Sequence, residues 1–148
     1  MRSRSSYKQS LQPECTTHMP AIDYADKHRA TLEVEFHFAA AHRLPRYDGP
    51  CVRNHGHNYR LFVILEGEVD PHSGMVADFG RVKELVQEHV LSRADHRDLN
   101  EFLENPTAEN IARWAFEALA PHLAGLAEVR LFEIPGCCVV YRGSPGAR

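Results

Sequence analysis

The sequence lacks the marks of several protein classes. It has four cysteines in 148 residues and no C-x-x-C pair, so we expect no disulfide framework and a chain suited to a reducing compartment. No apolar run approaches the roughly 20 residues of a membrane-spanning helix, and residues 1–30 contain none of signal-peptide length. These absences predict a cytoplasmic protein that does not enter a membrane.

Basic residues are not in excess either. The chain has 17 lysines and arginines against 20 aspartates and glutamates, which gives a formal net charge of −3. Nucleic-acid binding relies on a basic surface, so no nucleic-acid partner is expected. The hydrophobic fraction of 43% is ordinary for a small globular domain. Histidine is the exception, because ten are present.

Residues 1–30 differ in composition from the rest of the chain. They are polar, rich in serine and without hydrophobic periodicity, which predicts a flexible N-terminal extension. Met19 is an alternative start. Residues 31–148 are expected to form a single domain.

Hydrophobic periodicity within that domain predicts four strands and two helices. Apolar residues recur at helical spacing after Asp78 and again after Thr107, and both residues are good N-caps. Alternating or β-branched runs predict strands, the last two joined by a Pro-Gly turn. The expected strands are residues 32–38, 58–66, 128–134 and 138–142. The order ββααββ indicates an α+β fold.

Three histidines and one cysteine fall within sixteen residues, at His42, Cys51, His55 and His57. Side chains two residues apart on a strand project from the same face, so His55 and His57 would share one. His42 lies on the face of the preceding strand that carries Phe36 and Phe38, so pairing of the two strands would bring three imidazoles together. Three protein ligands leave one tetrahedral position open, as in catalytic zinc sites. We therefore expect a Zn²⁺ enzyme, although imidazole also suits iron, copper or nickel.

Cys51 lies four residues before His55 and allows three interpretations. A nearby Zn²⁺ or Arg53 would favour the thiolate, which could act as nucleophile or general base. The thiolate could instead be a fourth metal ligand, which would make the site closed and structural. The third interpretation is an inert buried thiol.

Carboxylates mark two further candidate positions. Asp95 directly precedes His96 in an expected loop, where a carboxylate can orient an imidazole as a proton shuttle. A polar loop without that role is the alternative. Glu133 stands among apolar strand residues, where an unpaired carboxylate is costly. We expect it to make either a buried structural hydrogen bond or a bond to a ligand with adjacent N–H donors. Tyr59 and Trp114 are expected in the core.

Six segments together resemble the 6-pyruvoyltetrahydropterin synthase family, over a range from about Thr31 to Gly143. They are residues 38–44, 51–59, 74–79, 95–100 and 105–110, and Glu133 with residues 141–143. Only three residues separate Cys51 from His55, which is similar to the 6-carboxy-5,6,7,8-tetrahydropterin synthase branch, the branch of queuosine and 7-deazapurine biosynthesis.

The resemblance implies the tunnelling fold, in which a four-stranded antiparallel sheet carries two helices on one face. It also implies self-association: trimers close their sheets into a barrel, and two trimers stack into a hexamer. Active sites in such an assembly lie between subunits. Asp95 and His96 would then serve a site whose Cys51 comes from a neighbour.

The resemblance also implies a reaction. The substrate would be 7,8-dihydroneopterin triphosphate, and the products 6-carboxy-5,6,7,8-tetrahydropterin, acetaldehyde and triphosphate. Zn²⁺ would be bound by the three histidines, Cys51 and His96 would move protons with Asp95 orienting His96, and Glu133 would bind the pterin ring. No redox cofactor is expected. The alternatives are 6-pyruvoyl synthesis without side-chain cleavage, and a non-catalytic zinc- or pterin-binding module.

Overall fold

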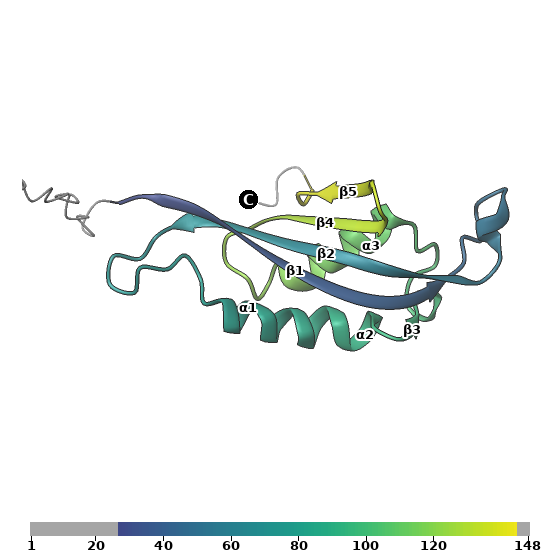
Figure 1. Ribbon diagram of the computed structural model, residues 1–148, viewed down its shortest axis with the longest axis horizontal. Helices are drawn as coiled ribbons and strands as arrows, with labels where there is room; N and C mark the ends of the chain where they lie inside the picture. Colours follow the sequence, from purple (N-terminus) through teal and green to yellow (C-terminus); the bar gives the residue numbers. More distant parts are fainter. Residues whose placement is uncertain (1–26, 145–148) are drawn as a thin grey trace, which may run out of the picture.

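The computed structural model describes residues 27–144 (Figure 1). The expected extension over residues 1–30 lies almost wholly outside the described residues, as does the alternative start at Met19. Within the described part of the chain, no helix is long and apolar enough to cross a membrane.

One mixed sheet forms the centre of the domain, with the strand order β3-β1-β2-β4-β5. Its long strands pair antiparallel, as the sequence predicts, over longer ranges than the periodicity indicates. The strands are β1 (Arg29–His42), β2 (His55–Glu68), β3 (Arg97–Asp98), β4 (Leu126–Ile134) and β5 (Cys137–Tyr141). The α+β architecture is thus confirmed, but the sheet has five strands where four were expected. The addition is β3, which pairs parallel to β1 and, at two residues, is too short to show alternation.

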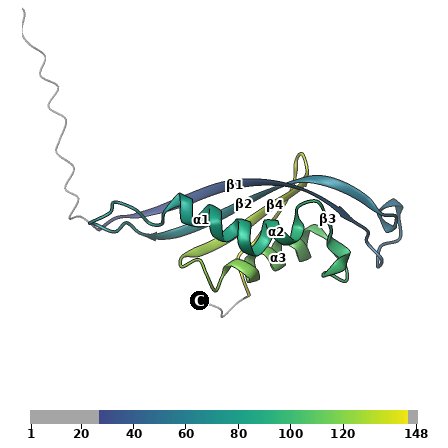
Figure 2. The same cartoon turned by 90° about the horizontal axis from the view of Figure 1, so that it is seen from below.

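Two helical segments cover one face of the sheet (Figure 2). The first is α1 (Phe79–Val86), which continues through a π-helical turn (Gln87–Leu91) into α2 (Ser92–Ala94), and the second is α3 (Ala108–Leu119). Both predicted N-caps are confirmed, because Asp78 accepts from the amide of Gly80 and Thr107 from that of Asn110. Both helices therefore begin where the capping residues indicate.

The core lies between this helical layer and the sheet. Alternate residues of β1 and β2 point toward the helices, and Tyr59, Leu61 and Val63 are fully buried. Tyr59 stacks on Phe38 at a ring-centroid distance of 4.9 Å. Its expected place in the core is confirmed, whereas Trp114 is only partly buried against the core. This alternation directs His42, His55 and His57 toward the helical side.

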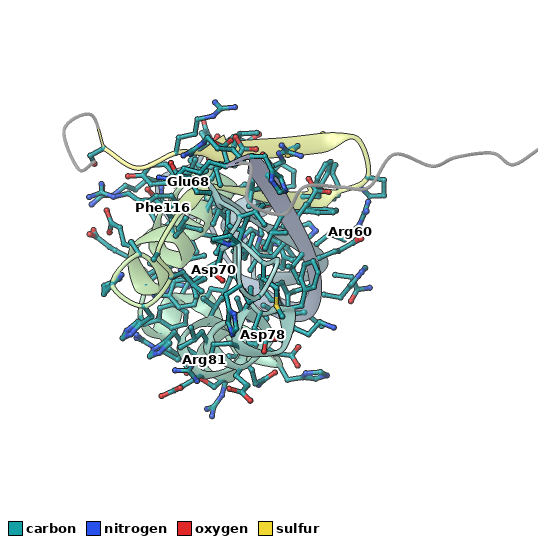
Figure 3. All side chains as sticks on the ribbon, turned by 90° about the vertical axis from the view of Figure 1, so that its left-hand side faces the viewer. Arg60, Glu68, Asp70, Asp78, Arg81 and Phe116 are labelled. Carbon is teal, nitrogen blue, oxygen red and sulfur yellow. The ribbon has the colours of Figure 1, made fainter. Side chains whose placement is uncertain are left out.

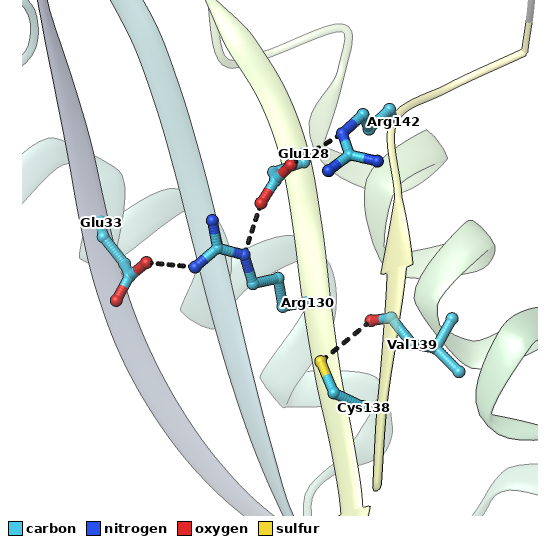
Figure 4. Close-up of polar contacts among 6 residues, drawn as sticks. All are labelled: Glu33, Glu128, Arg130, Cys138, Val139 and Arg142. Carbon is cyan, nitrogen blue, oxygen red and sulfur yellow. Dashed lines mark hydrogen bonds and ion pairs between the residues drawn. The ribbon is translucent and has the colours of Figure 1, made fainter.

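The opposite face of the sheet carries charged side chains in ion pairs (Figure 4). Arg130 bonds Glu33 across the sheet at 2.7 Å and also bonds Glu128, which in turn pairs with Arg142 at 2.9 Å. Arg60 lies on the side of the sheet opposite Phe116 of α3 (Figure 3). In the described part of the chain no helix covers this face.

Candidate metal centre and active site

Strand register brings the three histidines together at one end of the sheet. His42, the last residue of β1, pairs with His55, the first residue of β2, and His57 pairs with Ala40. Gly56 sits between the two β2 histidines, and a Cβ atom there would lie 3.2 Å from the carbonyl oxygen of Ala40. A small residue at this position therefore lets the two strands approach closely beside the site.

The three imidazoles converge closely enough to share one ion. One nitrogen from each of His42, His55 and His57 lies within 4.8 Å of the others. The Nε2 atoms of His42 and His55 are 3.1 Å apart. Two nitrogens on a tetrahedral zinc, each about 2.05 Å from it, would be separated by about 3.3 Å. His42 is fully buried, and the other two are partly buried.

Backbone carbonyls fix the tautomers of two of these rings. His42 Nδ1 lies 2.8 Å from the carbonyl oxygen of Pro106, and His55 Nδ1 lies 2.8 Å from that of Arg53. A carbonyl oxygen can only accept, so both Nδ1 atoms carry the hydrogen. The two Nε2 lone pairs then face each other, an arrangement that a bound cation stabilises.

His57 gives an independent indication that a ligand binds at this site. Its Nε2 atom is buried and has no hydrogen-bond partner among the described residues. Burial lowers the pKa of His57, against the opposing effect of the nearby Glu133 carboxylate. A neutral imidazole with a free lone pair is the form that binds metals. The residues at this site thus fit a metal ion.

Cys51 lies in the loop between β1 and β2, which joins the strand ends that carry His42 and His55. It is the middle residue of a single 3₁₀ turn (Pro50–Val52), is partly buried, and its carbonyl oxygen accepts from the amide of Leu44 at 2.8 Å. In the part of the chain that the structure describes, it is not among the residues whose ligand atoms converge. Among residues 27–144, therefore, three imidazoles converge without a fourth ligand side chain.

Asp95 and His96 contact each other at the outer edge of β1. The Asp95 carboxylate accepts from the amide of Ala39 at 3.0 Å and lies 2.9 Å from His96 Nδ1. The bond from Ala39, and next the contact with His96, lower the pKa of Asp95. His96 has φ = 58°, the one positive φ at a non-glycine position among residues 27–144. Such conformations concentrate at functional sites.

A surface depression connects this dyad with the histidine cluster. Its volume is about 550 Å³, and it is lined by His57 and Asn58 of β2 and by His96. Depressions of this size hold small organic ligands. His57 and His96 thus border one space, although Asp95 and His96 do not reach the converging nitrogens.

Glu133 lies on the opposite flank of the cluster. It is a partly buried residue near the end of β4, and its Oε1 atom is 3.5 Å from His57 Nε2. Burial, and next the Glu133 charge, raise the pKa of Tyr59, whose hydroxyl lies 3.4 Å from His42 Nδ1. Tyr59 therefore stays neutral at physiological pH, and Glu133 is the carboxylate closest to the histidines on this side.

Sequence reasoning did not identify the residues that support the site through their backbone. Arg53 was considered only as a cation and Pro106 was not considered by itself, yet their carbonyl oxygens orient His55 and His42. Asn100 was likewise not singled out, although its side chain bonds the backbone of Arg43. No side-chain pattern reports such contacts, because any residue can supply a carbonyl.

Comparison with known proteins gives one consistent family. The family described as 6-pyruvoyl tetrahydropterin synthase matches residues 31–144. The 6-carboxy-5,6,7,8-tetrahydropterin synthase of Synechocystis sp. is 39% identical over 106 residues, which cover 67% of this chain and 82% of that protein. The dihydroneopterin monophosphate aldolase of Pyrococcus furiosus is 44% identical over 71 residues, 48% of this chain and 60% of that protein. Among solved structures, Caenorhabditis elegans 6-pyruvoyl tetrahydropterin synthase has a TM-score of 0.73 at 36% identity, covering 79% of this chain and 97% of that one.

Proposed function

The chain belongs to the 6-pyruvoyl tetrahydropterin synthase family, and on that premise we propose that it is a zinc-dependent 6-carboxy-5,6,7,8-tetrahydropterin synthase. Its substrate would be 7,8-dihydroneopterin triphosphate, and its products 6-carboxy-5,6,7,8-tetrahydropterin, acetaldehyde and triphosphate. The reaction would serve queuosine or another 7-deazapurine pathway. The observation that carries the proposal is the set of three converging imidazoles with no fourth protein ligand in the described part of the chain.

Two observations support the 6-carboxy branch in particular. A relative with that name is 39% identical and is covered to 82% of its length. The gap of three residues between Cys51 and His55 resembles that branch. Zinc is favoured over other ions because the ligands are all imidazoles and the proposed reaction needs no external oxidant or reductant.

In this proposal the metal and the candidate side chains have different roles. Bound Zn²⁺ would act as a Lewis acid toward the side-chain oxygens of the substrate. Cys51 would take and return protons on that side chain as a thiolate. His96, held by Asp95 at 2.9 Å, would be the complementary acid or base. Glu133 would accept hydrogen bonds from the amino and ring N–H groups of the pterin, close to the histidines.

Self-association is part of the proposal, as trimers that stack into a hexamer with active sites between subunits. Two features support it. Among residues 27–144, the outer edge of β1 is paired with another strand only at Ala40 and Ala41, and a long unpaired edge is a liability that assembly removes. The Asp95–His96 dyad lies on that same edge, apart from the converging nitrogens of its own chain.

A second candidate is 6-pyruvoyl synthesis, in which triphosphate is eliminated and the side chain stays intact. The observation that favours it is the C. elegans enzyme, whose structure superposes with a TM-score of 0.73 at 36% identity. Both reactions would use the same metal centre, so geometry alone does not separate them.

Product analysis separates the candidates. Purified zinc-loaded protein is incubated with 7,8-dihydroneopterin triphosphate, and the pterin and acetaldehyde are followed by mass spectrometry. Acetaldehyde together with a 6-carboxy pterin is the expected result. A 6-pyruvoyl product without acetaldehyde would establish the second candidate, and binding without turnover would indicate a non-catalytic pterin-binding module.

A further inference from the structure

The segment from Asp95 to Asn100 runs along the outer edge of β1 as far as the metal ligand. Asp95 and His96 both bond the backbone of Ala39, the latter through its amide at 2.6 Å. The next two residues form β3 against Ala40 and Ala41. The segment therefore follows β1 residue by residue toward His42.

Asn100 extends this pairing one residue beyond the end of β1. Its Oδ1 accepts from the amide of Arg43 at 2.8 Å, and its Nδ2 donates to the carbonyl oxygen of Arg43 at 3.0 Å. One carboxamide thus satisfies both backbone groups of Arg43, as the facing residue of an antiparallel pair would. The orientation of the amide is unambiguous, because a backbone N–H only donates and a carbonyl oxygen only accepts.

The pair of hydrogen bonds between the Asn100 carboxamide and the Arg43 backbone, here called the clamp, starts from an anchored residue. Asp98 accepts from the amide of Asn100 at 3.0 Å and so caps the single 3₁₀ turn Leu99–Glu101. Leu99 is fully buried in the core. The carboxamide of Asn100 is therefore presented from an anchored turn rather than from a free loop.

Arg43 lies between the histidine at the end of β1 and the loop that carries Cys51. It follows the ligand His42 directly, and it precedes Leu44, whose amide donates to the carbonyl oxygen of Cys51 at 2.8 Å. Fixing the Arg43 backbone fixes the direction in which the chain leaves the metal and returns to Cys51. We propose that Asn100 is a positioning residue that holds His42 and Cys51 in register through the backbone of Arg43. The inference rests on the proposed metal centre.

Asparagine is the side chain that can fill this role. Aspartate would keep the acceptor for the Arg43 amide but would place a second acceptor against the Arg43 carbonyl. Alanine would remove both bonds. The variants Asn100→Asp and Asn100→Ala therefore remove one half and then the whole of the clamp.

A matched control is available at the far end of the same sheet. Asp70 also organises a loop through its side chain, accepting from the amides of His72 and Ser73 at 3.0 and 2.7 Å. It follows the C-terminal end of β2, whereas His55 is at the N-terminal end of that strand. Asp70→Ala thus removes a comparable side-chain-to-backbone contact without touching the metal end.

The experiment measures Zn²⁺ affinity of the full chain by chelator competition, together with the visible spectrum of the Co²⁺-substituted protein and the thermal midpoint of the apoprotein. Asn100→Ala should weaken Zn²⁺ binding about tenfold, within the usual range for outer-shell changes, and should alter the Co²⁺ spectrum. Asn100→Asp should lie between wild type and Asn100→Ala. Asp70→Ala should lower only the thermal midpoint.

Three results would overturn the inference, and they are distinguishable. Asn100→Ala with a wild-type Co²⁺ spectrum and a Zn²⁺ affinity within about twofold of wild type would overturn it while the metal centre stands. If Asn100→Ala fails to fold, unchanged Zn²⁺ binding and Co²⁺ spectrum in Asn100→Asp would do the same. Absence of stoichiometric Zn²⁺ binding by the wild type would overturn the proposed metal centre and the inference together.

Discussion

At the scale of single residues, the candidate metal centre shows how backbone carbonyls set the tautomers of imidazoles. The carbonyl oxygens of Pro106 and Arg53 hold the hydrogens of His42 and His55 on Nδ1, which leaves both Nε2 atoms as acceptors. His57 Nε2 has no hydrogen-bond partner among residues 27–144, and burial lowers the pKa of this ring, which favours its neutral form. Local contacts or burial thus favour, in each ring, the neutral imidazole with a free nitrogen lone pair that metal binding requires.

Replacing Cys51 distinguishes its three interpretations. In Cys51→Ala we expect turnover to fall by at least about 100-fold, the usual contribution of one acid or base, while bound Zn²⁺ stays stoichiometric, because the three imidazoles converge without it. Steady-state kinetics and metal analysis check both expectations. Cys138→Ala, which alters an exposed thiol on β5, is the control. Loss of metal in Cys51→Ala would instead make the thiol a fourth ligand.

The Asp95 carboxylate should make stability depend on pH in the acid range. The amide of Ala39, and then His96, hold the pKa of Asp95 below its ordinary value. A lowered folded-state pKa means that the stabilisation is complete above the unfolded value of about 3.9 and is lost as pH falls through the folded-state pKa. We expect wild type to exceed Asp95→Asn in free energy of unfolding at pH 7, and the difference to shrink below about pH 4.

Urea titrations of wild type and Asp95→Asn between neutral pH and pH 3 would measure this difference. Asp48→Asn, at an exposed carboxylate in the loop between β1 and β2, provides the comparison. A difference between wild type and Asp95→Asn that stayed constant over the whole range would contradict the assignment.

At the scale of elements, the sequence predicts what depends on side-chain periodicity and not what depends on backbone pairing. Alternation in β1 and β2 places three histidines on one face, and the capping residues locate the starts of both helices. The pairing of residues 97–98 with β1 was not predicted, since two residues show no period. The partnership of His42 with Pro106 spans 64 positions along the chain, and only the folded structure brings the two together.

The N-terminus of α3 should influence the metal centre, and that of α1 should not. Thr107 caps α3 directly after Pro106, whose carbonyl oxygen orients His42, whereas Asp78 caps α1 away from the site. We expect Thr107→Ala and Asp78→Ala each to lower the free energy of unfolding by about 1 kcal/mol. Only Thr107→Ala should also weaken Zn²⁺ binding. Urea denaturation and chelator competition on both variants test this prediction. Equal Zn²⁺ affinities of the two variants would contradict an influence of the α3 cap on the metal centre.

At the scale of the whole molecule, the candidate metal site joins segments that are distant in sequence. Its three converging histidines come from β1 and β2, the carbonyl that orients His42 from the loop before α3, and Glu133 from β4. The sheet face away from the helices carries an ion-pair network that reaches from Glu33 to Arg142. A metal that binds only the folded arrangement therefore stabilises the whole domain.

Removal of the metal should consequently lower global stability. At free Zn²⁺ one hundred times the dissociation constant, binding to the native state alone contributes about 2.7 kcal/mol, so chelation should shift the urea midpoint by a corresponding amount. His42→Ala should abolish the response to added Zn²⁺, because the ring that bridges the Pro106 carbonyl and the Nε2 cluster is lost. The burial of His42 also means that this variant leaves a cavity and is less stable than the wild-type apoprotein. A Zn²⁺ response retained in His42→Ala would mean that the stabilising ion binds elsewhere.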